Sequence, residues 1–301
     1  MQILLLNAYE AWRSAIQYHD KIKNGFVTLQ YQKGFVSALH NAVELFLKQM
    51  MLDNNEYGVV QVRNLDKNSK KKQEKIDLMR DYLNASDLNV FFTDLKENKP
   101  ELFKHFYSIE FSALIDYAEE LTENVNMKHD LNLLKDLRIN EVHFYFDEDF
   151  LREDEFCRLH NFMADFYDVL LEKQYIGNIT FNTTNSKISV LTTEHQFMKF
   201  TFEKWNCFSY REAVKRNPLI KIIATELSQT GFESEQKHEE NFHLFWIAEL
   251  IIEKSDITEN YNEIFAFLVA MEHQNRFRTI CLNLGKPING FYRYAIEVDL
   301  K

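Results

Sequence analysis

The sequence predicts a mainly α-helical protein, with an N-terminal helical bundle and a C-terminal α+β domain. Glycine and proline are scarce, at 7 and 3 in 301 residues, which favours long helices and few tight turns. Apolar residues recur at helical spacing through the first half of the chain. Near residue 175 the pattern changes to alternating β-branched and aromatic residues, which is typical of strands. We therefore expect two domains, at residues 1–174 and 175–301.

The first half contains two strong helical patterns and several weaker ones. Residues 3–23 and 34–52 carry wide apolar stripes, and Asn24-Gly25 is a stop signal between them. Residues 54–75 predict a loop because they lack helical periodicity. Further helices are expected at 74–84, 87–96, 100–123 and 127–142, and a last long helix is expected at 150–174.

The second half predicts strands within residues 178–205, then helices and a final hairpin. The helices are expected at 209–229, 240–255 and 258–274, with Asp256 and Glu259 as a capping pair for the last one. The hairpin surrounds a Gly-Lys-Pro-Ile-Asn-Gly turn near the C-terminus. Helices followed by a hairpin have the order of a winged helix, in which three arginines would contact phosphates: Arg276, Arg278 and Arg293. A sensing, dimerising or regulatory role is the alternative.

The charge balance limits the way in which this chain can bind nucleic acid. Its formal net charge is −11, whereas proteins that bind nucleic acid through a broad surface are usually basic. A small basic pocket on an acidic body remains compatible with this charge. The dense basic cluster of the first half includes Lys70, Lys71 and Lys72. These lysines form either a solvated loop and helix start or a contact with a phosphate backbone.

Cysteine usage and hydropathy indicate a cytoplasmic protein. The three cysteines, Cys157, Cys207 and Cys281, are far apart in the sequence, which fits a reducing compartment and no disulfide framework or zinc site. No apolar run approaches the roughly 18 residues that a membrane span needs, and the N-terminus lacks a signal-peptide pattern. Gly-rich phosphate loops, GxSxG and HExxH motifs are absent from the sequence. We therefore expect no metal, no cofactor and no membrane partner.

The segment Arg138-Ile-Asn-Glu-Val-His143 carries the most informative chemistry. RNA supplies its own nucleophile, the 2′-OH, so an enzyme needs a proton-transfer group and a cation for the charged transition state. Histidine titrates near neutrality, and arginine holds two phosphate oxygens at once. Asn140 adds a polar group that would orient the histidine or contact the phosphate. Arg13 and His19 form a second arginine–histidine match, but without the same helical context.

Residues 5–172 resemble the HEPN family, all-helical bundles whose signature is an arginine, four to six residues and a histidine before a last long helix. Glu44, in the helix at 34–52, matches the buried acidic residue of the family's early helix. The family commonly has a polar residue directly after the arginine; here Ile139 takes that place and Asn140 follows. The resemblance implies a metal-independent endoribonuclease that acts as a homodimer. It also implies a toxin or antiviral abortive-infection effector, with an antitoxin or trigger protein as partner.

Structural alternatives exist for each of these residues. Arg138 would be a surface residue paired with Glu141 or Asp136, and His143 would cap a helix end. Glu44 would be a structural acid bonded to a neighbour such as His40, one helical turn away. The departure at Ile139 and the acidic first half support a catalytically silent HEPN-like scaffold that binds a nucleotide or a protein.

Overall fold

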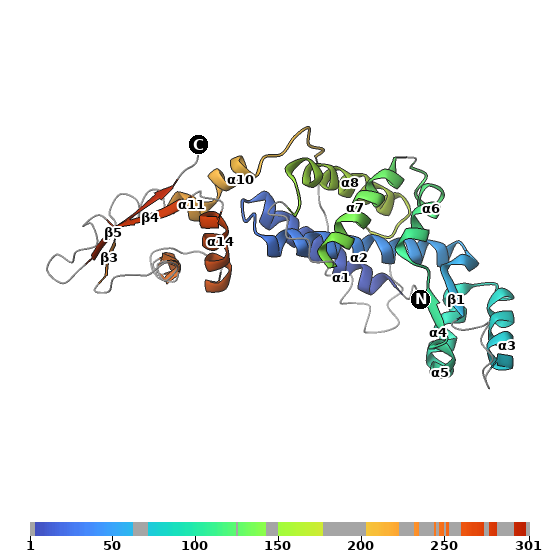
Figure 1. Ribbon diagram of the computed structural model, residues 1–301. Coiled ribbons are helices and arrows are strands. Elements are labelled where there is room, and N and C mark those ends of the chain that lie inside the picture. The colour runs from blue at the N-terminus through green and yellow to red at the C-terminus, as the bar shows by residue number, and fades with distance from the viewer. Residues whose placement is uncertain are drawn as a thin grey trace. The chain divides into compact units, whose positions relative to one another are not determined.

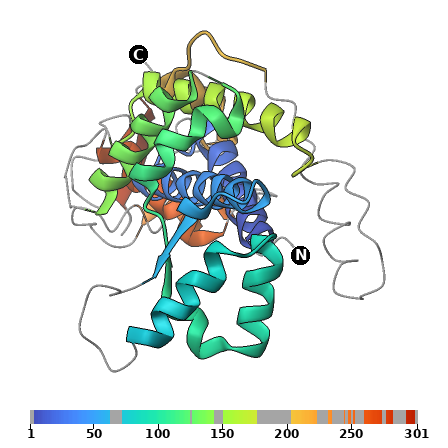
Figure 2. The same ribbon diagram turned by 90° about the vertical axis from the view of Figure 1, so that its right-hand side faces the viewer.

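The computed structural model is mainly α-helical, as the sequence predicts, with two small antiparallel sheets among the described residues (Figures 1 and 2). Contacts between residues group the chain into two compact units. The described residues are 4–62, 72–124, 126–142, 150–176, 203–222, 232–234, 244, 247–249, 251–252, 260–273, 277–281 and 292–298.

The two units do not follow the sequence in order. The first unit is Met1–Ile16 with Gly34–Cys207, and the second unit is Gln17–Lys33 with Phe208–Lys301. Residues 17–33 therefore belong with the C-terminal part of the chain, a grouping that the sequence did not predict. The domain boundary expected between residues 174 and 175 stays a prediction, because residues 177–202 lie outside the described residues.

Two long N-terminal helices, α1 (Leu5–Lys23) and α2 (Leu29–Asp53), form where the apolar stripes predict them. Helix α2 begins five residues before its expected start at residue 34. Thr28 supplies the reason, since its Oγ1 accepts the backbone N–H of Tyr31 at 3.3 Å and caps the first turn. The stop expected at Asn24-Gly25 is confirmed, because Gly25 has a φ of +88°, which favours glycine.

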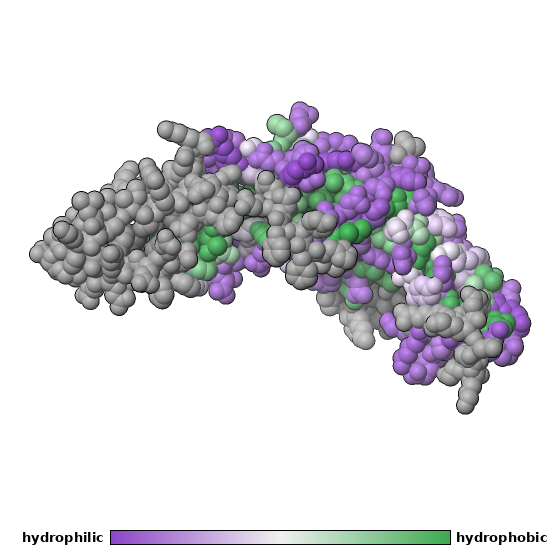
Figure 3. All heavy atoms as spheres, in the orientation of Figure 1, coloured by the Kyte–Doolittle hydropathy of each residue, from purple (hydrophilic) through white to green (hydrophobic). Residues whose placement is uncertain are grey.

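The core of the first unit forms around Trp12 of α1, which is fully buried. Its ring lies 6.4 Å from that of Phe46 on α2 and 6.0 Å from that of Phe166 on α8 (Glu153–Glu172), measured between centroids. Large aromatic side chains bury more apolar surface than any others and so contribute strongly to stability. Outside the core, hydrophilic residues cover most of the described surface that is in view in Figure 3, and hydrophobic residues form smaller patches.

Two regions of the first unit differ from the sequence expectation. The expected loop at 54–75 contains the 3₁₀ helix η1 (Tyr57–Val59), the strand β1 (Val60–Val62) and the start of α3 (Lys72–Leu83). The expected helix at 100–123 is three elements, α5 (Pro100–Phe103), β2 (Phe106–Ser108) and α6 (Phe111–Thr122). Strands β1 and β2 pair antiparallel with Val60 opposite Ser108. The backbone N–H and C=O groups that pair between the two strands are then not available for helical hydrogen bonds, so strand pairing competes with helix formation in this region.

An aromatic cluster fills the space between α3 and α4 (Leu88–Asn98) and reaches β2. The fully buried ring of Tyr82 lies 5.7 Å from Phe91, 5.7 Å from Phe92 and 5.4 Å from Phe106. Asp87 begins α4 by accepting the N–H of Val90 at 2.9 Å. These contacts show why a two-stranded ladder persists here, since an isolated pair of strands is only marginally stable without packing against helices.

Helices α6, α7 (Met127–Val142) and α8 follow in sequence and pack on one another. Arg158 of α8 donates to Asp130 of α7 at 2.6 Å, which ties the two helices together. Residues 203–207 lie along α8, where the Asn161 side chain exchanges two hydrogen bonds of 2.8 Å with the backbone of Trp205. The Trp205 ring stacks on His160 at 3.5 Å.

The second unit contains short helices and a three-stranded antiparallel sheet. Its described elements are α10 (Tyr210–Arg216), α11 (Pro218–Ile222), β3 (Phe232–Ser234), α14 (Tyr261–His273), β4 (Phe277–Cys281) and β5 (Tyr292–Val298). The final hairpin is confirmed, with Arg278 opposite Glu297. Strand β3 was not predicted and completes the order β3-β5-β4. The strands expected at 178–202 and the Asp256–Glu259 pair lie outside the described residues.

Candidate functional site

Helix α7 carries the arginine of the predicted motif near its C-terminal end, four residues before its final residue, Val142. Its inner face buries Leu131, Leu134 and Leu137. Arg138 is half-buried at the edge of this face, while Asn140 is exposed. Asn140 therefore lies on the solvent side of the helix, where a polar side chain is available to a ligand. His143 lies outside the described residues, as does the side chain of Glu141.

Opposite Arg138, helix α2 presents what we call the α2 polar cluster: His40, Glu44 and Lys48 at successive turns, together with Ser108 of β2. Lys48 is buried, and it contacts one carboxylate oxygen of Glu44 and donates to Ser108 Oγ at 2.8 Å. The second carboxylate oxygen of Glu44 lies 3.7 Å from His40 Nδ1. A buried lysine needs such partners because an unpaired charge in the interior is costly. Glu44 therefore has the contacts of a structural acid that is bonded to its neighbours.

His40 connects the α2 polar cluster to Arg138. Burial lowers the pKa of His40, and the charge of Arg138 lowers it further, with a smaller contribution from Lys48. The charge of Glu44 and a side-chain hydrogen bond with Asn41 raise the pKa of His40, but they do not outweigh burial. His40 is therefore neutral at physiological pH, and Arg138 lies close enough for its charge to act on the imidazole. Arg138 and Glu44 therefore both act on the His40 imidazole, in opposite directions.

The His40 ring also has an unusual polar environment. It lies against Phe111 of α6 with centroids 4.0 Å apart. Its Nδ1 is buried and makes no hydrogen bond to any described residue. A neutral imidazole carries one donor and one acceptor nitrogen, and buried polar atoms normally have partners. The sequence predicted His40 only as a neighbour of Glu44, without this orphaned nitrogen.

The second arginine–histidine match, in α1, is structural. Arg13 pairs with Glu10 at 3.0 Å on the exposed side of the helix. His19 is only 1% exposed, and burial lowers its pKa. A histidine this deeply buried has no access to an RNA backbone, so the burial of His19, and not a lack of helical context, argues against this match.

The remaining predicted contacts with phosphate lie at the limits of the described chain. Lys72 begins α3 and is exposed, whereas Lys70 and Lys71 lie outside the described residues. Arg276 also lies outside them. The β-sheet register places Arg278 opposite Glu297 and Arg293 opposite Glu233. In the backbone register each of these two arginines is therefore paired with an acidic residue.

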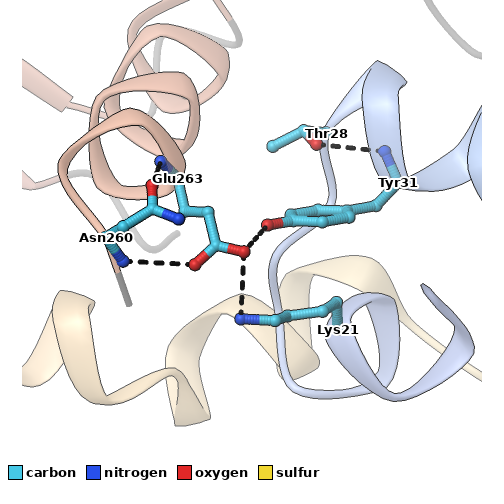
Figure 4. A network of polar contacts seen from close by, with 5 residues as sticks. All are labelled: Lys21, Thr28, Tyr31, Asn260 and Glu263. Atoms are coloured by element: carbon cyan, nitrogen blue, oxygen red, sulfur yellow. Dashed lines mark hydrogen bonds and ion pairs between the residues drawn. The ribbon is translucent and has the colours of Figure 1, made fainter. Parts of the chain in front are cut away.

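The second unit contains a polar network that the sequence did not predict, centred on Glu263 (Figure 4). Glu263 and Asn260 cap α14 reciprocally, with N–H···O distances of 3.1 and 3.2 Å. The Glu263 carboxylate also accepts the Tyr31 hydroxyl at 2.9 Å and pairs with Lys21 at 3.6 Å. The three-residue spacing of Asn260 and Glu263 is a capping signal, but nothing local indicates the partners in α1 and α2.

Comparison of the chain with family models, with curated proteins and with solved structures gave no match. Within the described ranges, no group of three or more histidine, cysteine or acidic side chains is arranged to hold a metal ion. No helix in the described part of the chain combines the length and apolarity that a membrane crossing requires.

Proposed function

We propose that the first unit is a metal-independent endoribonuclease of the HEPN type. The observation that carries this proposal is the position of Arg138, half-buried near the C-terminal end of α7, where its charge acts on His40 of α2, which lies 3.7 Å from Glu44. Asn140 is exposed two residues further on, and the long helix α8 follows. This is the order of elements on which the resemblance to the HEPN family rests.

In the proposed reaction, the RNA 2′-oxygen attacks the adjacent phosphorus and the bond to the 5′-oxygen breaks. The 2′-OH proton must leave and the 5′-oxygen must gain a proton, so the products are a 2′,3′-cyclic phosphate and a 5′-hydroxyl. His143 transfers one of these protons as general acid or base. Arg138 holds the non-bridging oxygens, whose negative charge grows in the transition state. Asn140 positions the phosphate or the imidazole.

A homodimer would bring two arginine–histidine pairs to one composite site. One histidine would then accept the 2′-OH proton while the other supplies a proton to the leaving oxygen. The substrate is RNA, and the resemblance suggests a toxin or antiviral effector that is held inactive by an antitoxin or switched on by a trigger protein. The net charge of −11 fits a local cationic contact with phosphate better than a wide RNA-binding surface.

The test is incubation of purified protein with total RNA and with tRNA in EDTA, followed by a denaturing gel. We expect cleavage by the wild type and none by His143→Ala. Arg138→Lys should be at least tenfold slower, because lysine keeps the charge but cannot hold two oxygens at once. His129→Ala is the matched control, since His129 is exposed in the first turn of α7, far along the helix from Arg138.

Full activity of His143→Ala would contradict the proposal. Absence of cleavage by every form of the protein, in the presence of a folded far-UV spectrum, would favour the catalytically silent scaffold. Cleavage by all variants at one rate would place the activity at another site.

A further inference from the structure

We propose that the second unit binds a small phosphorylated compound with a planar ring, in a cavity of about 970 Å³ lined by α1, α2, the α10–α11 junction and α14. This binding site is separate from the nuclease site proposed for the first unit and does not depend on it. Cavities that hold small ligands measure about 300–1,000 Å³, so the volume is sufficient for a compound of this size.

The charges that line this cavity favour an anion. Three cations, Lys21, Lys23 and Arg216, face two carboxylates, Asp20 and Glu263. The excess of one positive charge stands out in a chain with a net charge of −11. An anion that approaches the protein would therefore find local attraction here against a generally repulsive field.

A second cavity of about 440 Å³, in the first unit, provides an internal comparison. It is lined by one cation, Lys99, and by four carboxylates, those of Glu74, Asp77, Asp81 and Asp94. The excess of three negative charges would repel a phosphate. A phosphorylated ligand is thus matched to the cavity of the second unit and not to this one.

Aromatic side chains in the larger cavity supply the surface for a planar ring. Tyr18 is half-buried, and its ring centroid lies 6.3 Å from that of Tyr31. Phe26 is buried, 6.3 Å from Tyr31, and the Lys21 ammonium lies 4.9 Å from its centroid. Aromatic faces bind planar rings by stacking, and a lysine beside them adds a cation.

The walls of the cavity are fixed to one another before any ligand binds. Glu263 of α14 holds both Lys21 of α1 and Tyr31 of α2, as Figure 4 shows. Asn217, between α10 and α11, donates to the backbone carbonyl of Asn24 at 2.9 Å. A preformed cavity loses less entropy on binding than one that must be ordered by its ligand.

The division of roles among the three cations follows from their exposure. Lys21 is paired with Glu263 and serves mainly to hold the wall. Lys23 and Arg216 are exposed on the lining, and Arg216 Nε donates to the Glu212 carbonyl at 3.2 Å, which anchors the guanidinium at the end of α10. Lys23 and Arg216 are therefore the residues that we expect to contact the phosphate.

The experiment is calorimetric titration of the intact chain with AMP, GMP, CMP and UMP as probes, and with adenosine and inorganic phosphate separately. We expect at least one nucleoside monophosphate to bind, and its nucleoside and inorganic phosphate each to bind at least tenfold more weakly. Lys23→Ala and Arg216→Ala should each weaken that binding about tenfold or more, the usual effect of losing one charge-assisted hydrogen bond. Tyr18→Ala should weaken it by removing part of the stacking surface.

Lys215→Ala is the matched control for Arg216→Ala. Lys215 is the neighbouring cation on α10, but it pairs with Glu212 at 2.9 Å and does not line the cavity. Both side chains lie at the surface of α10, so neither change should alter thermal unfolding. The Lys215 variant should bind the nucleotide as the wild type does.

Three results would overturn the proposal: no binding of any of the four monophosphates at millimolar concentration, wild-type affinity in both Lys23→Ala and Arg216→Ala, or equal affinity for phosphate alone. A short oligoadenylate as a further probe identifies the source of the ligand. Tighter binding of the oligonucleotide than of AMP would assign the site to an RNA end, and tighter binding of AMP would assign it to a free nucleotide. Both outcomes support the same phosphate-and-ring chemistry.

Discussion

Each unit contains a lysine–glutamate ion pair, yet the two pairs differ in the exposure of the lysine. The carboxylates are similar, with 25% of the Glu44 side chain and 29% of the Glu263 side chain exposed. The lysine side chains are not, since Lys48 is 6% exposed and Lys21 is 30% exposed. Because Lys48 is buried, the stability of the fold depends on its pairing with Glu44, since a buried charge without its partner is strongly destabilising. The Lys21 charge of the second pair is partly hydrated, so the fold depends less on its carboxylate partner.

The largest effect should come from breaking the buried pair. We expect Glu44→Ala to lower the free energy of unfolding by about 3 kcal/mol, because Lys48 keeps its charge and loses its carboxylate. Urea denaturation followed by circular dichroism would measure the change. The double variant Glu44→Ala/Lys48→Met should recover most of the lost free energy of unfolding, since it also removes the buried Lys48 charge that has no carboxylate partner. A single variant within about 0.5 kcal/mol of the wild type, the usual range for a surface substitution, would show that the pair is not buried in solution.

The pair in the second unit should matter less. Glu263→Ala removes the α14 cap and the acceptor of the Tyr31 hydroxyl, for a loss of about 2 kcal/mol in total. Lys21 adds little to this loss because its side chain remains hydrated. Glu263→Gln keeps an oxygen for the Asn260 N–H and should lose only about half as much. A loss larger than that of Glu44→Ala would reverse the comparison between the two pairs.

The pH dependence of stability, which arises from protonation of the buried His40, should be a smaller and more gradual effect. Burial, together with the charge of Arg138, lowers the folded-state pKa of His40 below the ordinary value of 6.5. Between these two pKa values the unfolded chain binds a proton that the folded chain does not. The contribution of His40 to stability is therefore full above pH 6.5 and falls as the pH drops toward the folded pKa. Its slope cannot exceed about 1.4 kcal/mol per pH unit.

Urea denaturation between pH 8 and pH 5 would measure this dependence. His40→Gln should flatten the fall in stability, whereas His129→Gln should not, because His129 is exposed. Burial also lowers the pKa of His19, so part of the fall should persist in the His40 variant. Identical slopes for the wild type and His40→Gln would contradict the assignment of a neutral, buried His40.

Elements with local signals were predicted well, and those with distant partners were not. Helices α1, α2 and α8 carry long apolar stripes, and the sequence predicted all three. Strand β2 was read as part of a helix because its register partner β1 lies about 45 residues earlier in the chain, with Val60 opposite Ser108. Local propensity says nothing about such pairing, and tertiary contacts decide it.

The candidate sites follow the same rule. Arg138, Asn140 and Glu44 were identified from spacing within single helices, and the structure adds His40, on which the charges of both Arg138 and Glu44 act. The cavity of the second unit combines residues from α1 and α2 with Arg216 and Glu263, so that no window of the sequence contains its chemistry. A local signal there is the capping spacing of Asn260 and Glu263, which the sequence analysis missed because it assigned the cap to Asp256 and Glu259. The role of Ser108, which accepts from Lys48, depends in turn on the β1–β2 ladder.

We propose that the first unit cleaves RNA through the 2′-OH, with Arg138 and His143 and without a metal. The most direct measurement is the chemistry of the product ends after incubation in EDTA, for an oligoribonucleotide and for the same sequence with 2′-O-methyl groups. We expect 2′,3′-cyclic phosphate and 5′-hydroxyl ends from the oligoribonucleotide, with no cleavage of the methylated strand and none by His143→Ala. Cleavage of the methylated strand, or cleavage that needs an added divalent cation, would contradict it.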